Sequence, residues 1–154
     1  MIRCTLATVG KIRDKNLARL SQEFEKRVSR YAQLRVVETP DIPPKSDGSH
    51  IDRWSSNLLA AAPNGSLIVA LDEGGEVWSS EQFSSWLQER ALRGQSDFAF
   101  LIGGADGLGD VSRKAANQVL SLSRMTFTHE MARVFFLEQL YRAMTIWRGE
   151  PYHR

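Results

Sequence analysis

The chain has 154 residues, of which 42% are hydrophobic and 25% are charged, which fits one globular domain with a single core. Cys4 is the only cysteine, which excludes a disulfide framework, and no apolar run approaches the roughly 20 residues that cross a bilayer, so we expect one cytoplasmic domain over residues 1–154 without membrane association. The net charge of +2 does not by itself indicate nucleic acid, although arginines outnumber lysines 15 to 5 and guanidinium groups suit phosphate and base contacts.

Predicted strands and helices alternate along the whole chain. Short apolar and β-branched runs indicate the strands, and apolar residues at helical spacing indicate the helices. Ser79 and Gln82 form a capping box that begins one helix, and Gly94 ends it. In chain order the patterns predict strand 2–9, helix 17–31, strand 34–38, helix 51–62, strand 66–71, helix 79–94, strand 98–102, helix 110–117, a brief strand 120–123 and helix 130–147. Asp110 is the expected cap of the helix 110–117. Such alternation predicts an α/β fold in which helices sandwich a mainly parallel sheet.

Two of the predicted strands end in glycine-containing loops, 71–75 and 102–107. Ligands of open α/β sheets bind beyond the carboxyl ends of the strands, and glycines let backbone amides approach a ligand closely. That these loops only make turns is an equal alternative at this point. The second loop lacks the Gly-x-x-x-x-Gly-Lys pattern and comes late in the chain, which argues against kinase-like and dehydrogenase-like folds.

The segment 122–127 offers apolar side chains that can enclose a purine and backbone groups that can read its edge. Taken alone, it fits a core strand and its exit loop better. No cluster of residues has metal-ligand spacing, so we expect no metal.

The last predicted helix is apolar around most of its circumference, whereas a surface helix shows one apolar stripe. It must be buried on several sides, either against a second copy of the chain or within one monomer. Glu138 and Arg142 have the favourable i,i+4 order for an ion pair. The chain then ends in a tail, Tyr152-His153-Arg154, whose side chains can stack on a base, move a proton and hold a phosphate, although tails often fray.

Four segments together resemble the RlmH family of SPOUT-class methyltransferases, and the resemblance spans essentially the whole chain. The segments are Ala7-Thr8-Val9-Gly10-Lys11, Ile102-Gly103-Gly104-Ala105-Asp106-Gly107, Leu120-Ser121-Leu122-Ser123-Arg124-Met125-Thr126-Phe127, and the stretch from Leu137-Glu138-Gln139-Leu140-Tyr141-Arg142-Ala143 through Pro151-Tyr152-His153-Arg154. The resemblance implies a C-terminal trefoil knot, a homodimer and transfer of a methyl group from S-adenosylmethionine (SAM) to the N3 nitrogen of a pseudouridine in 23S ribosomal RNA of the assembled ribosome. Residues 41–57 resemble the family only loosely, so no role is transferred to them.

The same resemblance implies which residues carry the activity. The cofactor contacts fall at Leu71, Gly103, Leu122, Ser123, Arg124, Met125, Thr126 and Phe127. The tail is implied to bind and orient the RNA from the partner subunit. We expect His153 to accept the ring-nitrogen proton, Arg142 and Arg154 to hold phosphate or the base anion, and Tyr152 to orient the nucleotide.

Two other functions remain as alternatives to the methyltransferase. One is a non-catalytic ribosome-binding module, which SAM binding would exclude. The other is a nucleotide hydrolase that uses the Gly103 loop, although no phosphate-binding lysine or metal-binding carboxylate pair lies near that loop in the sequence. For the methyltransferase, we expect Gly103→Val to block the pocket while sparing the fold.

Overall fold

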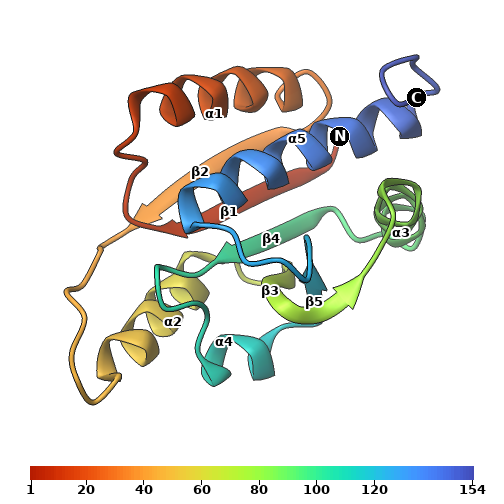
Figure 1. Ribbon diagram of the computed structural model, residues 1–154. Coiled ribbons are helices and arrows are strands. Elements are labelled where there is room, and N and C mark those ends of the chain that lie inside the picture. The colour runs from red at the N-terminus through yellow and green to blue at the C-terminus, as the bar shows by residue number, and fades with distance from the viewer.

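The computed structural model describes residues 1–154 and shows a five-stranded sheet between two layers of helices (Figure 1). The strands lie in the order β2-β1-β4-β3-β5, and every pairing is parallel. The elements are β1 (Arg3–Val9), α1 (Lys15–Val28), β2 (Gln33–Thr39), α2 (Ser49–Ala61), β3 (Leu67–Val77), α3 (Ser80–Leu92), β4 (Asp97–Ile102), α4 (Asp110–Ala115), β5 (Gln118–Ser121) and α5 (His129–Trp147). The predicted α/β sandwich is confirmed, and the trefoil knot stays a prediction.

Alternate residues of the central strands face opposite layers of helices. In β4, Phe98 and Phe100 join the larger core, which lies under α1, α3 and α5, whereas Leu101 joins the smaller core under α2. The strand is therefore buried on both faces. Because neither face meets water, its sequence is a continuous apolar run, and this pattern made the strand predictable.

Strand β3 is longer than its sequence predicts. The expected strand 66–71 continues after an irregularity, because both Leu71 and Glu76 pair with Leu120 of β5. Residues 72–75, which we call the β3 bulge, leave the ladder between these two pairings. A Cβ atom at Gly75 would lie 2.7 Å from the backbone of β5, so a glycine is needed for this close approach. The predicted loop 71–75 is thus a bulge within one strand.

Helix α4 is shorter than predicted and begins differently. Gly109, not Asp110, occupies the N-cap position, and no side chain caps the helix. The Asp110 carboxylate instead accepts a hydrogen bond from Arg113, which removes it from the capping role. The helix also ends at Ala115, two residues earlier than expected.

The brief strand β5 lies two residues earlier than the predicted 120–123. Leu122 and Ser123 therefore belong to the loop that leads to α5, where they can line a cavity. Thr128 ends that loop, and its side chain caps α5 by accepting a hydrogen bond from the backbone N–H of Met131.

Helix α5 packs against both α1 and α3 above the sheet (Figure 1). Burial within one chain accounts for most of its apolar circumference, which is the monomeric alternative raised by the sequence. Phe135 is the exception, because it is 39% exposed and contacts Phe127, with 4.9 Å between the ring centroids. None of the helices is both long and apolar enough to span a bilayer.

Candidate functional site

A cavity of about 810 Å³ opens at the carboxyl ends of β3 and β4, next to the start of α5. Its volume is in the usual range for small-molecule sites. All of the predicted cofactor-binding residues except Arg124 line it, namely Leu71, Gly103, Leu122, Ser123, Met125, Thr126 and Phe127. The structure therefore brings together segments more than 50 residues apart in the sequence, at the edge of the sheet where ligands of this fold class bind.

The glycine-rich loop after β4 forms one wall of the cavity as a tight turn. The backbone N–H of Gly107 donates to the carbonyl oxygen of Gly104 at 2.9 Å, and Gly107 has a φ of +83°. A Cβ atom at Gly103 would lie 2.4 Å from the Gly107 carbonyl group. The expectation that Gly103→Val spares the fold is therefore wrong, because the added side chain would push the backbone of the turn apart.

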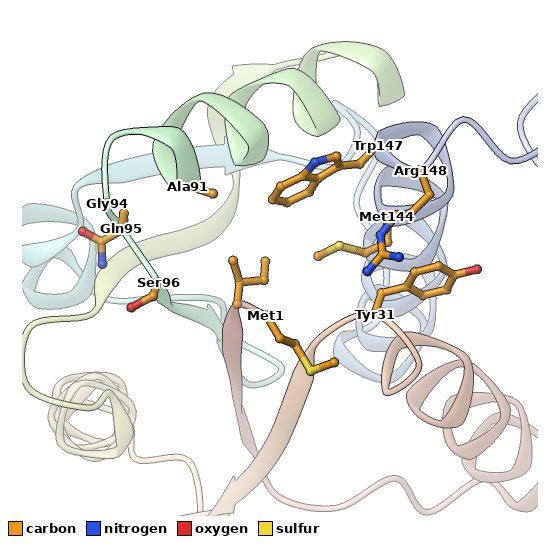
Figure 2. A pocket seen from close by; sticks show the side chains of 10 residues that line it. Met1, Tyr31, Ala91, Gly94, Gln95, Ser96, Met144, Trp147 and Arg148 are labelled. Atoms are coloured by element: carbon orange, nitrogen blue, oxygen red, sulfur yellow. The ribbon is translucent and has the colours of Figure 1, made fainter.

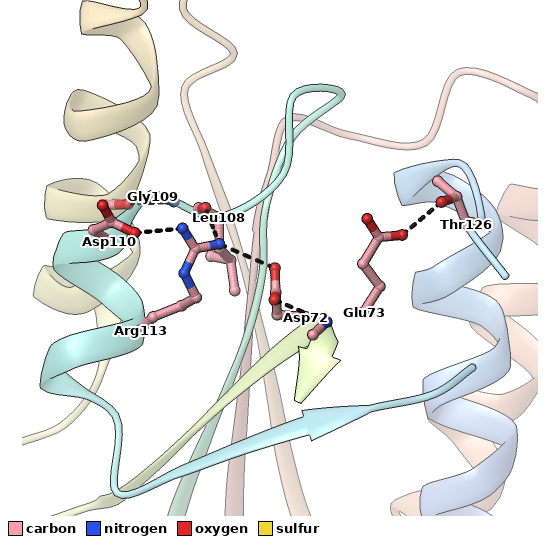
Figure 3. Close-up of polar contacts among 9 residues, drawn as sticks. Asp72, Glu73, Leu108, Gly109, Asp110, Arg113 and Thr126 are labelled. Atoms are coloured by element: carbon pink, nitrogen blue, oxygen red, sulfur yellow. Dashed lines mark hydrogen bonds and ion pairs between the residues drawn. The ribbon is translucent and has the colours of Figure 1, made fainter. Parts of the chain in front are cut away.

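Arg113 ties three segments of the cavity wall together (Figure 3). Its Nη1 atom lies 3.3 Å from Oδ1 of Asp72 in the β3 bulge and 3.0 Å from the carbonyl oxygen of Leu108, and its Nη2 atom donates to Asp110. The hydrogen bond with Asp110 raises the pKa of Arg113 and lowers the pKa of the Asp110 carboxyl. Sequence reasoning missed Arg113, and the only local signal was its i,i+3 spacing from Asp110.

The opposite wall is the loop 122–128, which is held by its own side chains. Ser123 Oγ accepts a hydrogen bond from the backbone N–H of Met125 at 2.9 Å, and the Ser123 carbonyl oxygen accepts one from Ser121 Oγ at 2.9 Å. Thr126 donates from its hydroxyl to Glu73 in the β3 bulge (Figure 3). The two sides of the cavity are thus joined at Thr126, and no group of three or more His, Cys, Asp and Glu side chains is placed to hold a metal.

The predicted tail residues gather around Glu138 and Arg142 of α5. Tyr152 donates from its hydroxyl to Glu138 at 2.9 Å, and Arg142 forms the predicted ion pair with Glu138 at 2.7 Å. The Arg142 guanidinium also lies over the Tyr152 ring, 4.9 Å from its centroid. Desolvation and the Glu138 carboxylate raise the pKa of Tyr152. Arg154 is exposed.

Both ring nitrogens of His153 are engaged in this arrangement. Nδ1 lies 3.0 Å from the Nη1 atom of Arg142, which can only donate, so Nδ1 is an acceptor. Nε2 lies 2.6 Å from Oε1 of Glu81 and carries the proton shared with that carboxylate. The hydrogen bond with His153 lowers the pKa of Glu81. To take up a further proton, His153 must release Arg142.

The tail residues lie outside the cavity of their own chain. His129 and Ala132, at the start of α5, line the cavity, whereas the side chains of the tail reach back along α5 to Glu138 and Arg142. Glu138 follows His129 at a distance of roughly 14 Å along the helix axis, at 1.5 Å per residue. The structure therefore brings Arg142, Tyr152 and His153 together but does not bring them to the cavity of their own chain.

A second cavity, of about 540 Å³, lies at the amino-terminal edge of the sheet (Figure 2). Trp147, Met144, Met1 and Ile2 supply much of its apolar lining. None of the predicted cofactor-binding or tail residues lines it. Because ligands of open parallel sheets bind at the carboxyl edge, the first cavity is the candidate site.

Known proteins are similar to this chain over its whole length. The family model described as "Predicted SPOUT methyltransferase" matches residues 2–153. A protein of Symbiobacterium thermophilum named Ribosomal RNA large subunit methyltransferase H is 41% identical over 99% of this chain and 100% of its own length. Proteins of the same name from Gemmatimonas aurantiaca and Clostridium acetobutylicum are 41% and 38% identical, over 99% and 97% of this chain and 100% and 98% of their own lengths.

Two solved structures share the fold at low sequence identity. A probable methylase family protein from Haemophilus influenzae aligns over 100% of this chain and 72% of its own with a TM-score of 0.61 and 11% identity. TrmJ from Z. mobilis aligns over 100% of this chain and 73% of its own with a TM-score of 0.58 and 13% identity. At these identities the likeness describes the arrangement of helices and strands alone.

Proposed function

The chain belongs to the SPOUT methyltransferase family, and from this premise we propose that it transfers a methyl group from SAM to large-subunit ribosomal RNA. The observation that carries the proposal is the cavity at the carboxyl edge of the sheet, which collects seven of the eight residues predicted to bind the cofactor. The full-length similarity to proteins named Ribosomal RNA large subunit methyltransferase H supports the substrate class. The site of action is then the ribosome in the cytoplasm.

The chemistry of the cavity fits SAM. Its adenosine and methionine parts need apolar enclosure and backbone contacts, which Leu71, Leu122 and the glycine-rich loop provide. A Cβ atom on Gly103 would meet the Gly107 backbone at 2.4 Å, so a glycine is required for the turn that forms this wall of the cavity. When bound, SAM supplies a methyl group on a positively charged sulfur, and the carboxylates of Asp72, Glu73 and Asp106 line the same cavity.

The proposed acceptor is the N3 nitrogen of a pseudouridine in 23S ribosomal RNA. This nitrogen lies between two carbonyl groups and carries a proton, so it has no free lone pair until a base removes that proton. His153 is the candidate acceptor of the proton, and its Nδ1 atom can take up that proton once the hydrogen bond with Arg142 is broken. In this proposal Arg142, released from His153, and Arg154 stabilise the base anion or a phosphate, and Tyr152 orients the nucleotide.

The separation of tail and cavity supports a homodimer in which each site uses the partner's tail. Within one chain no tail residue lines the cavity, because Tyr152 and His153 contact Glu138 and Arg142 instead. An antiparallel pairing of the α5 helices of two copies would place each tail beside the other cavity. The exposed Phe135 and its neighbour Phe127 lie at the cavity end of this surface and provide apolar area for such a contact.

Two measurements test the proposed function. Calorimetry should show SAM binding, and intact folding without binding would leave a non-catalytic ribosome-binding module. Mass spectrometry of ribosomal RNA, from cells with and without the gene, should show the loss of one methyl group on one pseudouridine. Nucleotide hydrolysis without SAM binding would favour a hydrolase instead.

A further inference from the structure

His50 is a buried histidine, 3% exposed, in the first turn of α2. Its Nδ1 atom accepts a hydrogen bond from the backbone N–H of Lys45 at 2.9 Å. Its Nε2 atom lies 2.6 Å from Oδ2 of Asp106 in the glycine-rich loop. Because Nδ1 accepts an amide proton, the neutral ring carries its own proton on Nε2 and donates it to the carboxylate. The loop after Pro40 therefore sets the tautomer of His50.

Two further residues of α2 hold the same loop. The indole ring of Trp54 packs against Gly104 so closely that a Cβ atom there would lie 2.7 Å from the ring. Ser55 Oγ accepts a hydrogen bond from the backbone N–H of Gly109 at 3.2 Å. His50 also contacts Trp54 edge to face, with centroids 4.8 Å apart. The amino-terminal half of α2 thus packs against the glycine-rich loop and fixes the backbone that carries Asp106.

Asp106 lines the cofactor cavity, and 47% of its side chain is exposed. Its contact with His50 engages Oδ2 and leaves Oδ1 available to a ligand. The partner of the carboxylate is an imidazole whose lone pair is occupied by the Lys45 N–H, and not a guanidinium. A neutral partner orients the carboxylate without cancelling its negative charge, so Asp106 keeps its attraction for a cationic or strongly polar donor.

We propose that Asp106 binds a hydrogen-bond donor of the cofactor, either the methionyl ammonium or a ribose hydroxyl, and that His50 is the residue that positions this carboxylate. The inference rests on the proposed function, because it concerns the same cavity. The role of His50 is preorganisation: a carboxylate already held in one rotamer does not lose that freedom when the ligand binds. The segment 41–49, to which no role was transferred by resemblance, thereby contributes to the cofactor site through Lys45.

The test is a double-mutant cycle read out as affinity for SAM by calorimetry. Asp106→Asn should weaken SAM binding by roughly ten-fold or more, since a hydrogen bond to a charged group is lost. His50→Phe keeps a flat ring against Trp54 but removes both hydrogen bonds, and it should weaken binding several-fold. In the Asp106→Asn background, His50→Phe should have little further effect on binding, because the group it positions is no longer a charged acceptor.

Two comparisons separate this role from a structural one and identify the donor. His50→Gln, whose amide N–H can reach Asp106, should recover much of the affinity lost in His50→Phe. If the phenylalanine variant does not fold, His50→Leu, which also lacks both hydrogen bonds, takes its place in the cycle. 5′-Methylthioadenosine has the ribose but no ammonium. If Asp106 binds the ammonium, Asp106→Asn should leave the affinity for 5′-methylthioadenosine unchanged. If Asp106 binds a ribose hydroxyl, the affinity for 5′-methylthioadenosine should fall as it does for SAM.

Wild-type SAM affinity in Asp106→Asn would overturn the inference, and fully additive effects of the two substitutions would overturn the positioning role of His50. Absence of SAM binding by the unmodified chain would overturn the proposed function, and the inference with it, so the two failures are distinct.

Discussion

The hydroxyl of Thr126 donates a hydrogen bond to Oε2 of Glu73 at 2.5 Å, and this bond joins the loop before α5 to the β3 bulge (Figure 3). Both residues line the cofactor cavity, from segments 53 residues apart in the sequence. The bond lies among exposed groups, so its contribution to the free energy of folding is small. Its effect should fall instead on the ligand, because it holds two walls of the cavity at a fixed separation.

Thr126→Val removes this hydroxyl while it keeps the shape of the side chain. We expect SAM affinity to fall by up to about ten-fold, the worth of roughly one hydrogen bond, with little change in Tm. Calorimetry and thermal unfolding measure the two quantities. Thr126→Ser keeps a hydroxyl and is the matched control. A valine variant with unchanged affinity and faster unfolding would show that the bond supports the fold and not the ligand.

His153→Ala should lower methylation of ribosomes by roughly two or more orders of magnitude, the usual contribution of a general base. SAM affinity should stay unchanged, because His153 does not line the cavity of its own chain. Methylation rates at several pH values provide the measurement. The control is Glu81→Gln, which alters the partner of Nε2 and keeps the imidazole. If His153→Ala retains the wild-type methylation rate and pH dependence, His153 does not accept the proton and at most positions the RNA.

A shared site predicts recovery of activity when two inactive chains are combined. One chain carries His153→Ala, and the other carries Ala132→Trp, which fills the cavity at the start of α5. In a mixed dimer, one cavity is open and faces an intact tail. After random reassociation half of the dimers are mixed and each has one working site, so about a quarter of the wild-type activity should return. If mixing restores no activity, or sedimentation shows a monomer, each chain acts alone.

Acid should abolish the contribution that the ion pair between Arg3 and Asp97 makes to the stability of the fold. Nη2 of Arg3 lies 2.6 Å from Oδ2 of Asp97. The hydrogen bond from Arg3 lowers the pKa of Asp97 in the folded chain. A carboxyl group whose pKa is depressed by folding stabilises the fold above its unfolded pKa of about 3.9, and this stabilisation is lost as the pH falls through the folded value. The Tm difference between the wild type and Asp97→Asn should therefore be constant from pH 7 to pH 5 and shrink below about pH 4. Arg3→Gln should reproduce the pattern, and a pH-independent difference would contradict it.

Cys4 should resist alkylation in the folded protein. It is 1% exposed near the start of β1, and burial raises the pKa of its thiol to about 12, so the reactive thiolate is nearly absent at pH 8. Mass spectrometry after treatment with iodoacetamide should find the native chain unmodified and the denatured chain modified once. Rapid labelling without denaturant would show that β1 opens locally.

Local patterns predicted most of the fold. Strand β4 was visible because both of its faces are buried, and α3 was visible because Ser79 and Gln82 form the predicted capping box. The pairing of Glu138 with Arg142 followed from the helical spacing alone. Each of these features depends on residues within a few positions of one another.

The features that the sequence did not reveal depend on distant parts of the chain. The bulge in β3 exists because β5 pairs on both sides of it, and nothing between Asp72 and Gly75 indicates where that pairing resumes. Arg113 meets Asp72 across 41 positions, and His50 meets Asp106 across 56. Taken singly in the sequence, an arginine in a short helix and a histidine in a loosely matching segment look like ordinary surface residues.

Helix α5 carries a cavity wall at its start and the tail just beyond its end, so its length sets the spacing between the two. One residue added to or removed from the middle of the helix would turn everything beyond that point by about 100°. Tyr152 and His153 would then project from a different side of the molecule, even if every side chain were retained. Insertions and deletions should accordingly be rejected between His129 and Trp147. The residue count of α5 is therefore under functional constraint, in addition to its composition.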